Sequence, residues 1–78
     1  MNNIRLLLER VLDQGGYYTL EWKFDLAVFD IRCYELVGNS ARIRVIFLYT
    51  DESFSAFIED RMLDQYGTEQ HIIKLLNL

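Results

Sequence analysis

Few side chains in this 78-residue sequence have the types and spacing that site chemistry requires. His71 is the only histidine and Cys33 the only cysteine, whereas a structural zinc site takes four ligands. A histidine transfers protons only beside a nucleophile or a substrate, so we expect His71 to be a surface or capping residue in the first turn of a last helix. Cys33 alternates with Phe29 and Ile31, which predicts a small core residue rather than a reactive thiolate.

Three carboxylates lie close together near the end of the chain, at Glu59, Asp60 and Asp64. Paired acids can share a proton or hold a divalent cation. Helical spacing would place these acids opposite Phe57 and Ile58, so a solvated helix face is the expected role. No phosphate-binding glycine motif is present either. The sequence therefore predicts no catalytic residue, no metal ligand and no cofactor, and a protein that is not an enzyme.

Composition predicts one folded domain over residues 1–78. The chain is 51% apolar and 14% aromatic, unlike a disordered segment, and its length suits one domain. No apolar run approaches the roughly 20 residues that cross a bilayer. A lone cysteine without a secretory signal indicates a cytoplasmic, reducing setting.

The charge balance narrows the class of partner. Asp and Glu outnumber Lys and Arg by 12 to 8, for a net charge of −4. Binding to nucleic-acid phosphates or anionic lipid needs clustered positive charge, so we expect neither direct nucleic-acid binding nor membrane binding. Acidity favours solubility and faster encounter with a basic protein.

The first predicted element is a helix that Asn2 or Asn3 caps and that Gly15 and Gly16 end, since glycine adopts the left-handed conformation at low cost. Arg5 and Glu9 lie four residues apart on the outer side of this helix, where they can pair and support it. Its apolar stripe consists of Ile4, Leu7, Leu8, Val11 and Leu12.

Three strands follow, over residues 18–25, 27–37 and 41–49, because the apolar period changes to two. The alternation of the first strand places Trp22 in the core. The turn Gly38-Asn39-Ser40 joins the second strand to the third, because glycine and asparagine tolerate positive φ.

Two helices complete the predicted fold. The first of them begins at Thr50 or Asp51 and ends at Gly67, with an apolar stripe of Phe54, Phe57, Ile58, Met62 and Tyr66. Thr68 then caps a short last helix. The fold class is α+β, in the order α-β-β-β-α-α, with a three-stranded antiparallel sheet and the helices packed on one face.

The outer face of this sheet is predicted to carry charged residues together with a few apolar ones. Tyr34, Arg42 and Arg44 project there, and so do Ile46 and Leu48. Exposed apolar residues rimmed by charge are typical of a protein-binding surface. The alternative is that the terminal helix or a second copy of the chain covers them.

The order α-β-β-β-α resembles the double-stranded RNA-binding domain. In that family the second helix begins with lysines that grip phosphates. The corresponding stretch here is Asp51-Glu52-Ser53-Phe54-Ser55-Ala56, which would repel phosphate. RNA binding is therefore not expected.

Three short stretches carry a second resemblance: Met1-Asn2-Asn3-Ile4 with Leu7 and Leu8, then Tyr18-Thr19-Leu20, and Asp51-Glu52-Ser53-Phe54 to Phe57-Ile58. With them, the chain resembles the small acidic anti-CRISPR proteins of phages and prophages that inhibit the type II-A effector nuclease. The resemblance implies a DNA mimic, whose carboxylates occupy a basic cleft that reads duplex DNA. The implied positions are Asp51, Glu52, Glu59, Asp60 and Asp64.

The sequence thus favours a non-enzymatic inhibitor that occludes a larger protein, such as a basic nucleic-acid-binding protein or a nuclease. An immunity or antitoxin-like protein that neutralises a cognate toxin is one alternative, and a homodimeric structural subunit is the other. Trp22, Tyr34 or Tyr66 would anchor the contact. The expected partner-binding residues are Asp51, Glu52, Glu59, Asp60, Asp64, Tyr34, Arg42, Arg44, Ile46 and Leu48.

Overall fold

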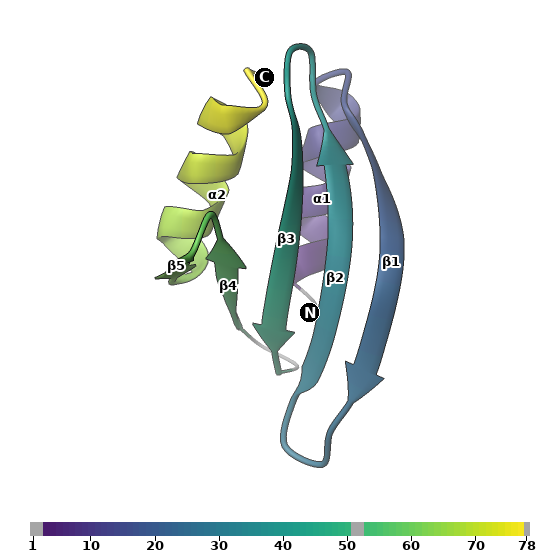
Figure 1. The fold of residues 1–78 in the computed structure, drawn as a ribbon, viewed down its shortest axis with the longest axis vertical. Coiled ribbons are helices and arrows are strands. Elements are labelled where there is room, and N and C mark those ends of the chain that lie inside the picture. The colour runs from purple at the N-terminus through teal and green to yellow at the C-terminus, as the bar shows by residue number, and fades with distance from the viewer. Residues whose placement is uncertain (1–2, 51–52, 78) are drawn as a thin grey trace.

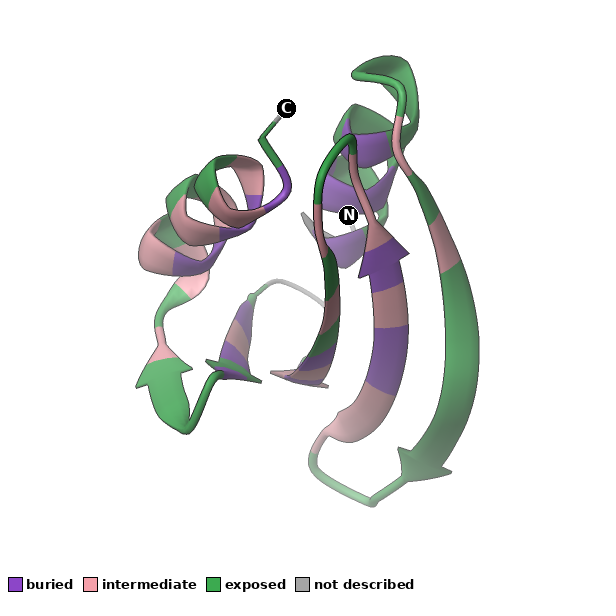
Figure 2. Ribbon diagram, turned by 45° about the horizontal axis from the view of Figure 1, so that its top comes forward, coloured by how far each residue is buried: buried purple, intermediate pink, exposed green. Residues whose placement is uncertain are grey.

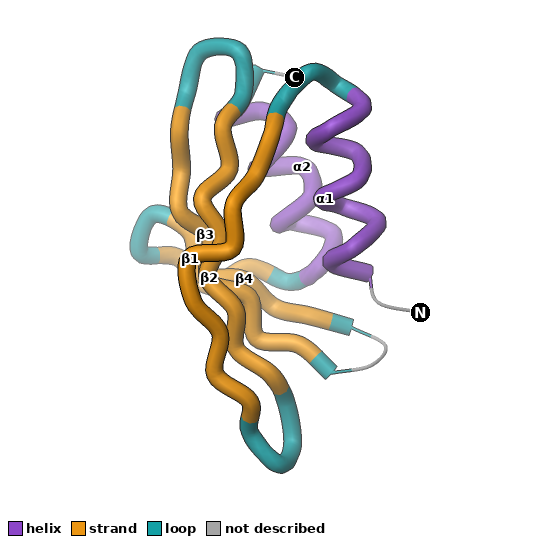
Figure 3. Tube along the Cα trace, turned by 90° about the vertical axis from the view of Figure 1, so that its right-hand side faces the viewer, coloured by secondary structure: helices purple, strands orange, loops and turns teal. Residues whose placement is uncertain are grey.

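The computed structural model, which describes residues 3–50 and 53–77, is a five-stranded antiparallel sheet with two helices. The strands follow one another across the sheet in chain order, and both helices lie on the same side of it (Figures 1 and 3). The α+β class and the one-sided packing of the helices agree with the prediction. The elements are α1 (Asn3–Asp13), β1 (Tyr17–Asp25), β2 (Asp30–Val37), β3 (Arg42–Tyr49), β4 (Phe54–Ile58), β5 (Arg61–Leu63) and α2 (Gln65–Leu75).

The predicted three strands and the order α-β-β-β-α-α are wrong after β3. The segment expected to form a helix is instead the hairpin of β4 and β5. Phe54, Ala56 and Ile58 are buried at every second position, which is strand periodicity. Glu59 and Asp60 form the two-residue turn with φ angles of 50° and 64°, a left-handed backbone that no helix contains.

One helix, α2, follows this hairpin, and its start differs from the prediction. Asp64 caps it, because the carboxylate Oδ1 accepts a hydrogen bond from the Gly67 amide at 2.7 Å. The Thr68 hydroxyl donates instead to the Asp64 carbonyl at 2.6 Å. Gly67 therefore lies inside the first turn of α2 and does not end a helix.

The core lies between the sheet and the two helices. Its centre is a series of edge-to-face aromatic contacts from Tyr34 to Phe47 and from Phe47 to Phe54, a favoured ring geometry. The expected stripe of the first helix is buried except for Leu12, which is exposed. The buried cluster consists of Ile4, Leu7, Leu8, Val11, Tyr34, Leu36, Val45, Phe47, Tyr49, Phe54, Ala56, Ile58, Ile72 and Leu76.

A bulge in β1 places Trp22 on the face opposite the helices. The register shifts between Leu20 and Trp22, so that Leu20 pairs with Tyr34 but Trp22 pairs with Cys33. Directly paired residues share a face of a sheet, and a bulge inserts one unpaired residue. The prediction that Trp22 lies in the core is therefore wrong, and its side chain is 47% exposed. Figure 2 shows β1 exposed along most of its length.

The two faces of β2 are the reverse of the prediction. Tyr34 packs in the core, opposite Val45 of β3, and is therefore absent from the outer face where it was expected. Arg32 also lies on the helix side, with its guanidinium 4.8 Å from the centre of the Tyr49 ring. Cys33 is buried, as expected, but on the outer side, beneath its neighbours on β1 and β3. Apolar residues occupy both faces of β2, so the partner strands decide which face is inside.

Neither helix of the described segments is long and apolar enough to cross a membrane.

Candidate functional site

A row of apolar side chains runs across all five strands on the face opposite the helices. Each member is the direct cross-strand partner of the next, so all of them share that face. Helices cover only the other face (Figure 3). The members, which we call the apolar row, are Trp22, Cys33, Ile46, Phe57 and Met62.

A second apolar row lies next to the first, toward the β1–β2 turn. Phe24 pairs with Ile31, and Ile31 pairs with Leu48. Beyond it, the turn itself presents Leu26 and Val28, and Val28 is 79% exposed. We call the two rows the outer patch. Isolated exposed apolar residues are ordinary, whereas several of them side by side on one face are a feature that interaction surfaces share.

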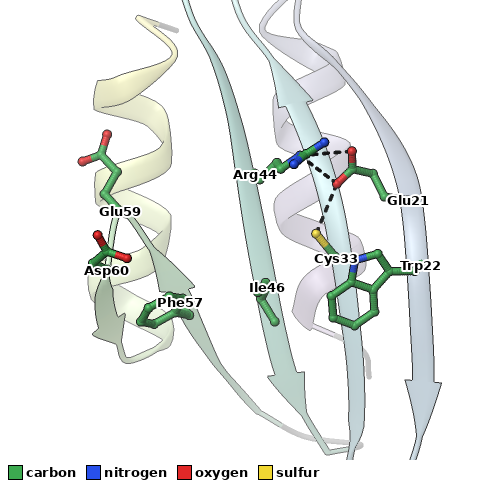
Figure 4. A pocket seen from close by; sticks show the side chains of 8 residues that line it. All are labelled: Glu21, Trp22, Cys33, Arg44, Ile46, Phe57, Glu59 and Asp60. Atoms are coloured by element: carbon green, nitrogen blue, oxygen red, sulfur yellow. Dashed lines mark hydrogen bonds and ion pairs between the residues drawn. The ribbon is translucent and has the colours of Figure 1, made fainter.

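The ends of the apolar row are more exposed than its middle. Met62 is 58% exposed and Phe57 is 37% exposed, whereas Cys33 is buried and Ile46 is half-buried. The face is therefore hollow at its centre. A pocket of about 430 Å³ occupies this hollow, with Trp22 and Glu21 on the β1 side and Phe57 with the β4–β5 turn on the other (Figure 4).

Glu21, the residue at the bulge, ties together the polar end of this pocket. Its carboxylate accepts a hydrogen bond from Arg44 Nε at 3.2 Å and one from the Cys33 thiol at 3.3 Å. Figure 4 shows these three side chains converging from β1, β2 and β3. The bulge thus supplies a charged partner for Arg44 next to the apolar row.

The Cys33 thiol is held in its protonated form. Burial raises the pKa of this thiol to about 11, and the hydrogen bond and charge of Glu21 act in the same direction, while Arg44 opposes them. The thiolate is the nucleophile and the metal-binding form of cysteine. The thiol is therefore a poor nucleophile at neutral pH, as expected from its sequence context.

The structure brings four of the predicted binding residues to the outer face. Arg42 and Arg44 lie on it beside Ile46 and Leu48, because all four alternate with the buried residues of β3. Arg42 forms an ion pair with Glu35 at 3.6 Å. Ile46 and Leu48 are half-buried members of the outer patch, and neither α1 nor α2 covers them.

The predicted acidic residues do not share one role. Glu59 and Asp60 form the β4–β5 turn and line the pocket, whereas Asp64 is used as the cap of α2. Asp51 and Glu52 lie outside the described residues. The expected helix face of acids is therefore replaced by a turn that places two carboxylates beside an aromatic pocket.

His71 lies in the middle of α2, one turn later than predicted. Its Nε2 atom is 3.6 Å from a Glu59 carboxylate oxygen. Within residues 3–50 and 53–77, no three His, Cys, Asp or Glu side chains are grouped so that they could hold a metal ion. The contact between Glu59 and His71 therefore links the β4–β5 turn to α2.

Most carboxylates of the described segments are engaged with cations. Six ion pairs with Lys or Arg occur there, and each uses a different acidic residue. The predicted pair of Arg5 and Glu9 is among them, at 3.2 Å. Exposed pairs of this kind add little stability, but they neutralise acidic charge at the surface.

Comparison with protein-family models, with curated proteins and with solved structures found no match for this chain. Function is therefore inferred from the chemistry of the site. Sequence reasoning missed two members of that site, Phe57 and Met62, and it named Trp22 as an anchor but placed it in the core. The alternation of Phe54, Ala56 and Ile58 fits β4, but Phe54, Phe57 and Ile58 fit helical spacing as well, so this signal alone does not identify the strand.

Proposed function

We propose that this protein is a non-enzymatic module that binds another protein through the outer patch. The observation that carries the proposal is the apolar row, which crosses the whole sheet and is most exposed at its ends. Tryptophan is among the residue types that dominate binding energy at interfaces. Trp22 and Phe57 would be the anchors, in place of the buried Tyr34.

The free energies of burial and association favour a large partner surface over a single small contact. Full burial of a large apolar side chain contributes about 1.5–3 kcal/mol. Association costs about 4–15 kcal/mol in lost freedom, so several half-exposed residues must be buried together. Trp22, Phe24, Phe57 and Met62 are arranged on one face for this. A folded protein surface can cover all of them at once.

The biological form of this proposal is an inhibitor that occludes a larger, basic protein. The net charge of −4 would speed encounter with such a target, since complementary charge acts mainly on the association rate. The anti-CRISPR likeness and the immunity-protein alternative both remain predictions of this type. They differ in the target and not in the surface that we assign.

Apolar docking is better supported than DNA mimicry. A mimic presents carboxylates to the basic cleft, yet the ion pairs with Lys and Arg neutralise six acidic residues. Of the positions suggested for mimicry, Asp64 caps a helix. Charge therefore steers the encounter, and the outer patch supplies the affinity.

Capture from cell lysate with matched variants tests the proposal. The tagged chain would be compared with Trp22→Ala and Phe57→Ala, and with Leu12→Ala on α1, whose side chain is 47% exposed like that of Trp22. We expect the wild-type and Leu12→Ala chains to retain the same protein and the two patch variants to lose it. Equal capture by all four chains would contradict the proposal.

Sedimentation of the chain alone distinguishes the inhibitor from the homodimeric subunit. Two antiparallel sheets can pack face to face about 10 Å apart, so a second copy is another conceivable occupant of the outer patch. We expect a monomer at micromolar concentration. A stable dimer that Trp22→Ala dissociates would favour the homodimeric subunit over the inhibitor.

A further inference from the structure

The pocket in the outer patch combines an apolar floor with an excess of negative charge. Ile46 forms the floor, and the rings of Trp22 and Phe57 stand on opposite sides of it (Figure 4). Three acidic residues, Glu21, Glu59 and Asp60, line the same pocket, against one cationic residue, Arg44, but the Glu59 carboxylate is turned away from Ile46 and toward α2 (Figure 4). Arg61, which follows this turn, does not add a second cation to the pocket. It pairs with the buried residue Ile58 and so lies on the helix side of the sheet.

Arg44 does not neutralise the carboxylates of the β4–β5 turn. Its Nε atom is hydrogen-bonded to Glu21 across the sheet, at 3.2 Å. Glu59 approaches His71 at 3.6 Å, and none of the ion pairs among the described residues uses Asp60. One side of the pocket is therefore neutral and the other side is acidic.

The backbone at this acidic turn also favours other residues. Both φ angles are positive, and two-residue hairpin turns of this kind prefer Asn-Gly or Asp-Gly. Glutamate at the first position is disfavoured in the left-handed region. A turn with an unfavourable residue beside a pocket suggests that the side chain has a use there.

We propose that this pocket receives an arginine side chain of the partner protein. The aliphatic stem would lie on Ile46, and the planar guanidinium would stack on Phe57 and pair with the carboxylate of Asp60 in the turn, with Trp22 on the far side of the pocket. Guanidinium stacks on aromatic rings and is weakly hydrated, and its hydrogen bonds to carboxylates are strong. The inference rests on the proposed function, because the pocket is the centre of the outer patch.

Other occupants fit this pocket less well. A purely apolar side chain would partly desolvate the carboxylate of Asp60 without pairing it, which is costly. An anion would be repelled. A lysine would pair with Asp60, but its strongly hydrated ammonium lacks the flat face that stacks on the Phe57 ring. The volume of about 430 Å³ lies within the range of ligand pockets.

Three short peptides that differ in one side chain test the inference. Acetylated and amidated Gly-Arg-Gly, Gly-citrulline-Gly and Gly-norleucine-Gly would be titrated into the ¹⁵N-labelled protein. Citrulline keeps the shape of arginine without its charge, and norleucine keeps only an apolar stem. We expect saturable shifts at residues 57–62 for the arginine peptide, at least tenfold weaker binding of the citrulline peptide, and no binding of the norleucine peptide.

Charge-neutral variants complete the test. Asp60→Asn should weaken binding of the arginine peptide at least fivefold, while Asp13→Asn, an exposed acid on α1, should leave it unchanged. Equal binding of all three peptides, no binding of the arginine peptide, or full binding by Asp60→Asn would overturn the inference. The proposed function fails separately, when Trp22→Ala captures the same protein as the wild type.

Discussion

Trp22 on β1 and Phe57 on β4 lie in one row of the outer sheet face, with Cys33 and Ile46 between them. This relationship depends on two local features, the bulge that turns Trp22 outward and the hairpin that gives Phe57 a strand position. Without the bulge, Trp22 would point toward the helices. The two rings therefore form the walls of a pocket whose floor is the middle of the sheet.

The first prediction separates the core from the outer patch. Phe47→Ala should lower the free energy of unfolding by about 3–5 kcal/mol, because Phe47 is fully buried between two aromatic rings and its loss leaves a cavity. Phe57→Ala should cost less than about 1.5 kcal/mol, since its ring is partly exposed in the absence of a partner. Urea unfolding followed by circular dichroism measures both. Similar losses would mean that Phe57 is part of the core.

The second prediction concerns the role of Asp64. Asp64→Ala should destabilise the protein by about 1 kcal/mol, because it removes the acceptor for the Gly67 amide. Asp64→Asn should retain most of the stability, since asparagine caps helices about as well as aspartate. Thermal melts of the two variants give the comparison. An equal loss in both would show that the charge of Asp64 matters and that capping does not.

The third prediction concerns a close approach between the β2–β3 turn and the end of α2. A Cβ atom at Gly38 would lie 2.4 Å from Leu76 atoms, including its backbone carbonyl oxygen. Gly38→Ala should therefore separate the turn from α2 and cost about 1–3 kcal/mol, as overpacking does. Ser40→Ala, at an exposed position of the same turn, is the control. A neutral Gly38→Ala would show that α2 does not pack there.

The fourth prediction follows from the raised pKa of the Cys33 thiol, which burial and Glu21 bring from 9.0 to about 11. The native protein should react with iodoacetamide at pH 8 at least about 100-fold more slowly than the urea-unfolded chain, because thiolate falls tenfold per pKa unit. Glu21→Gln should raise the native rate, since it removes a charge that raises the pKa, while Glu9→Gln should not. Equal native and unfolded rates would contradict the assigned environment of Cys33.

The same shift has a consequence for stability. The pKa of the Cys33 thiol is higher in the folded state than in the unfolded chain, so the folded state holds its proton more tightly. The thiol should therefore contribute to the free energy of unfolding below about pH 9, and this contribution should be lost as the pH rises toward 11. A comparison of the wild type with Cys33→Ala isolates this contribution from that of the tyrosines.

Elements with an unambiguous period were predictable from sequence. The stripe from Ile4 to Val11 fits a helix, and the alternation of Val45, Phe47 and Tyr49 fits a half-buried strand. The turn at Gly38 joins β2 to β3 as expected. For the same reason, Ile46 and Leu48 could be placed on the outer face before the structure was known.

The hairpin after β3 was not predictable by the same reasoning. Phe54, Phe57 and Ile58 satisfy helical spacing, while Phe54 and Ile58 satisfy strand spacing as well, and a short apolar run does not decide between them. Glu59 and Asp60 are also not the residues by which a two-residue turn is recognised. Tertiary packing decided the outcome, because Phe54 completes the aromatic core around Phe47.

The bulge in β1 cannot be recognised from the spacing of apolar residues in the sequence. Leu20 and Trp22 are two positions apart and would share a face in a regular strand, but the extra residue, Glu21, moves them to opposite faces. The hydrogen bonds of Glu21 to Arg44 and to Cys33 are tertiary contacts that no local pattern reveals. The pocket could therefore not be assembled from the sequence.

The accessibility of Trp22, the only tryptophan, tests the central claim most directly. The chain would be labelled with 5-fluorotryptophan, and its single ¹⁹F resonance would be recorded with a soluble paramagnetic agent, before and after addition of the captured partner. The outer-patch proposal predicts strong broadening in the free protein and protection in the complex. A resonance that is broadened equally in both states would show that the partner binds elsewhere, and would contradict the proposal.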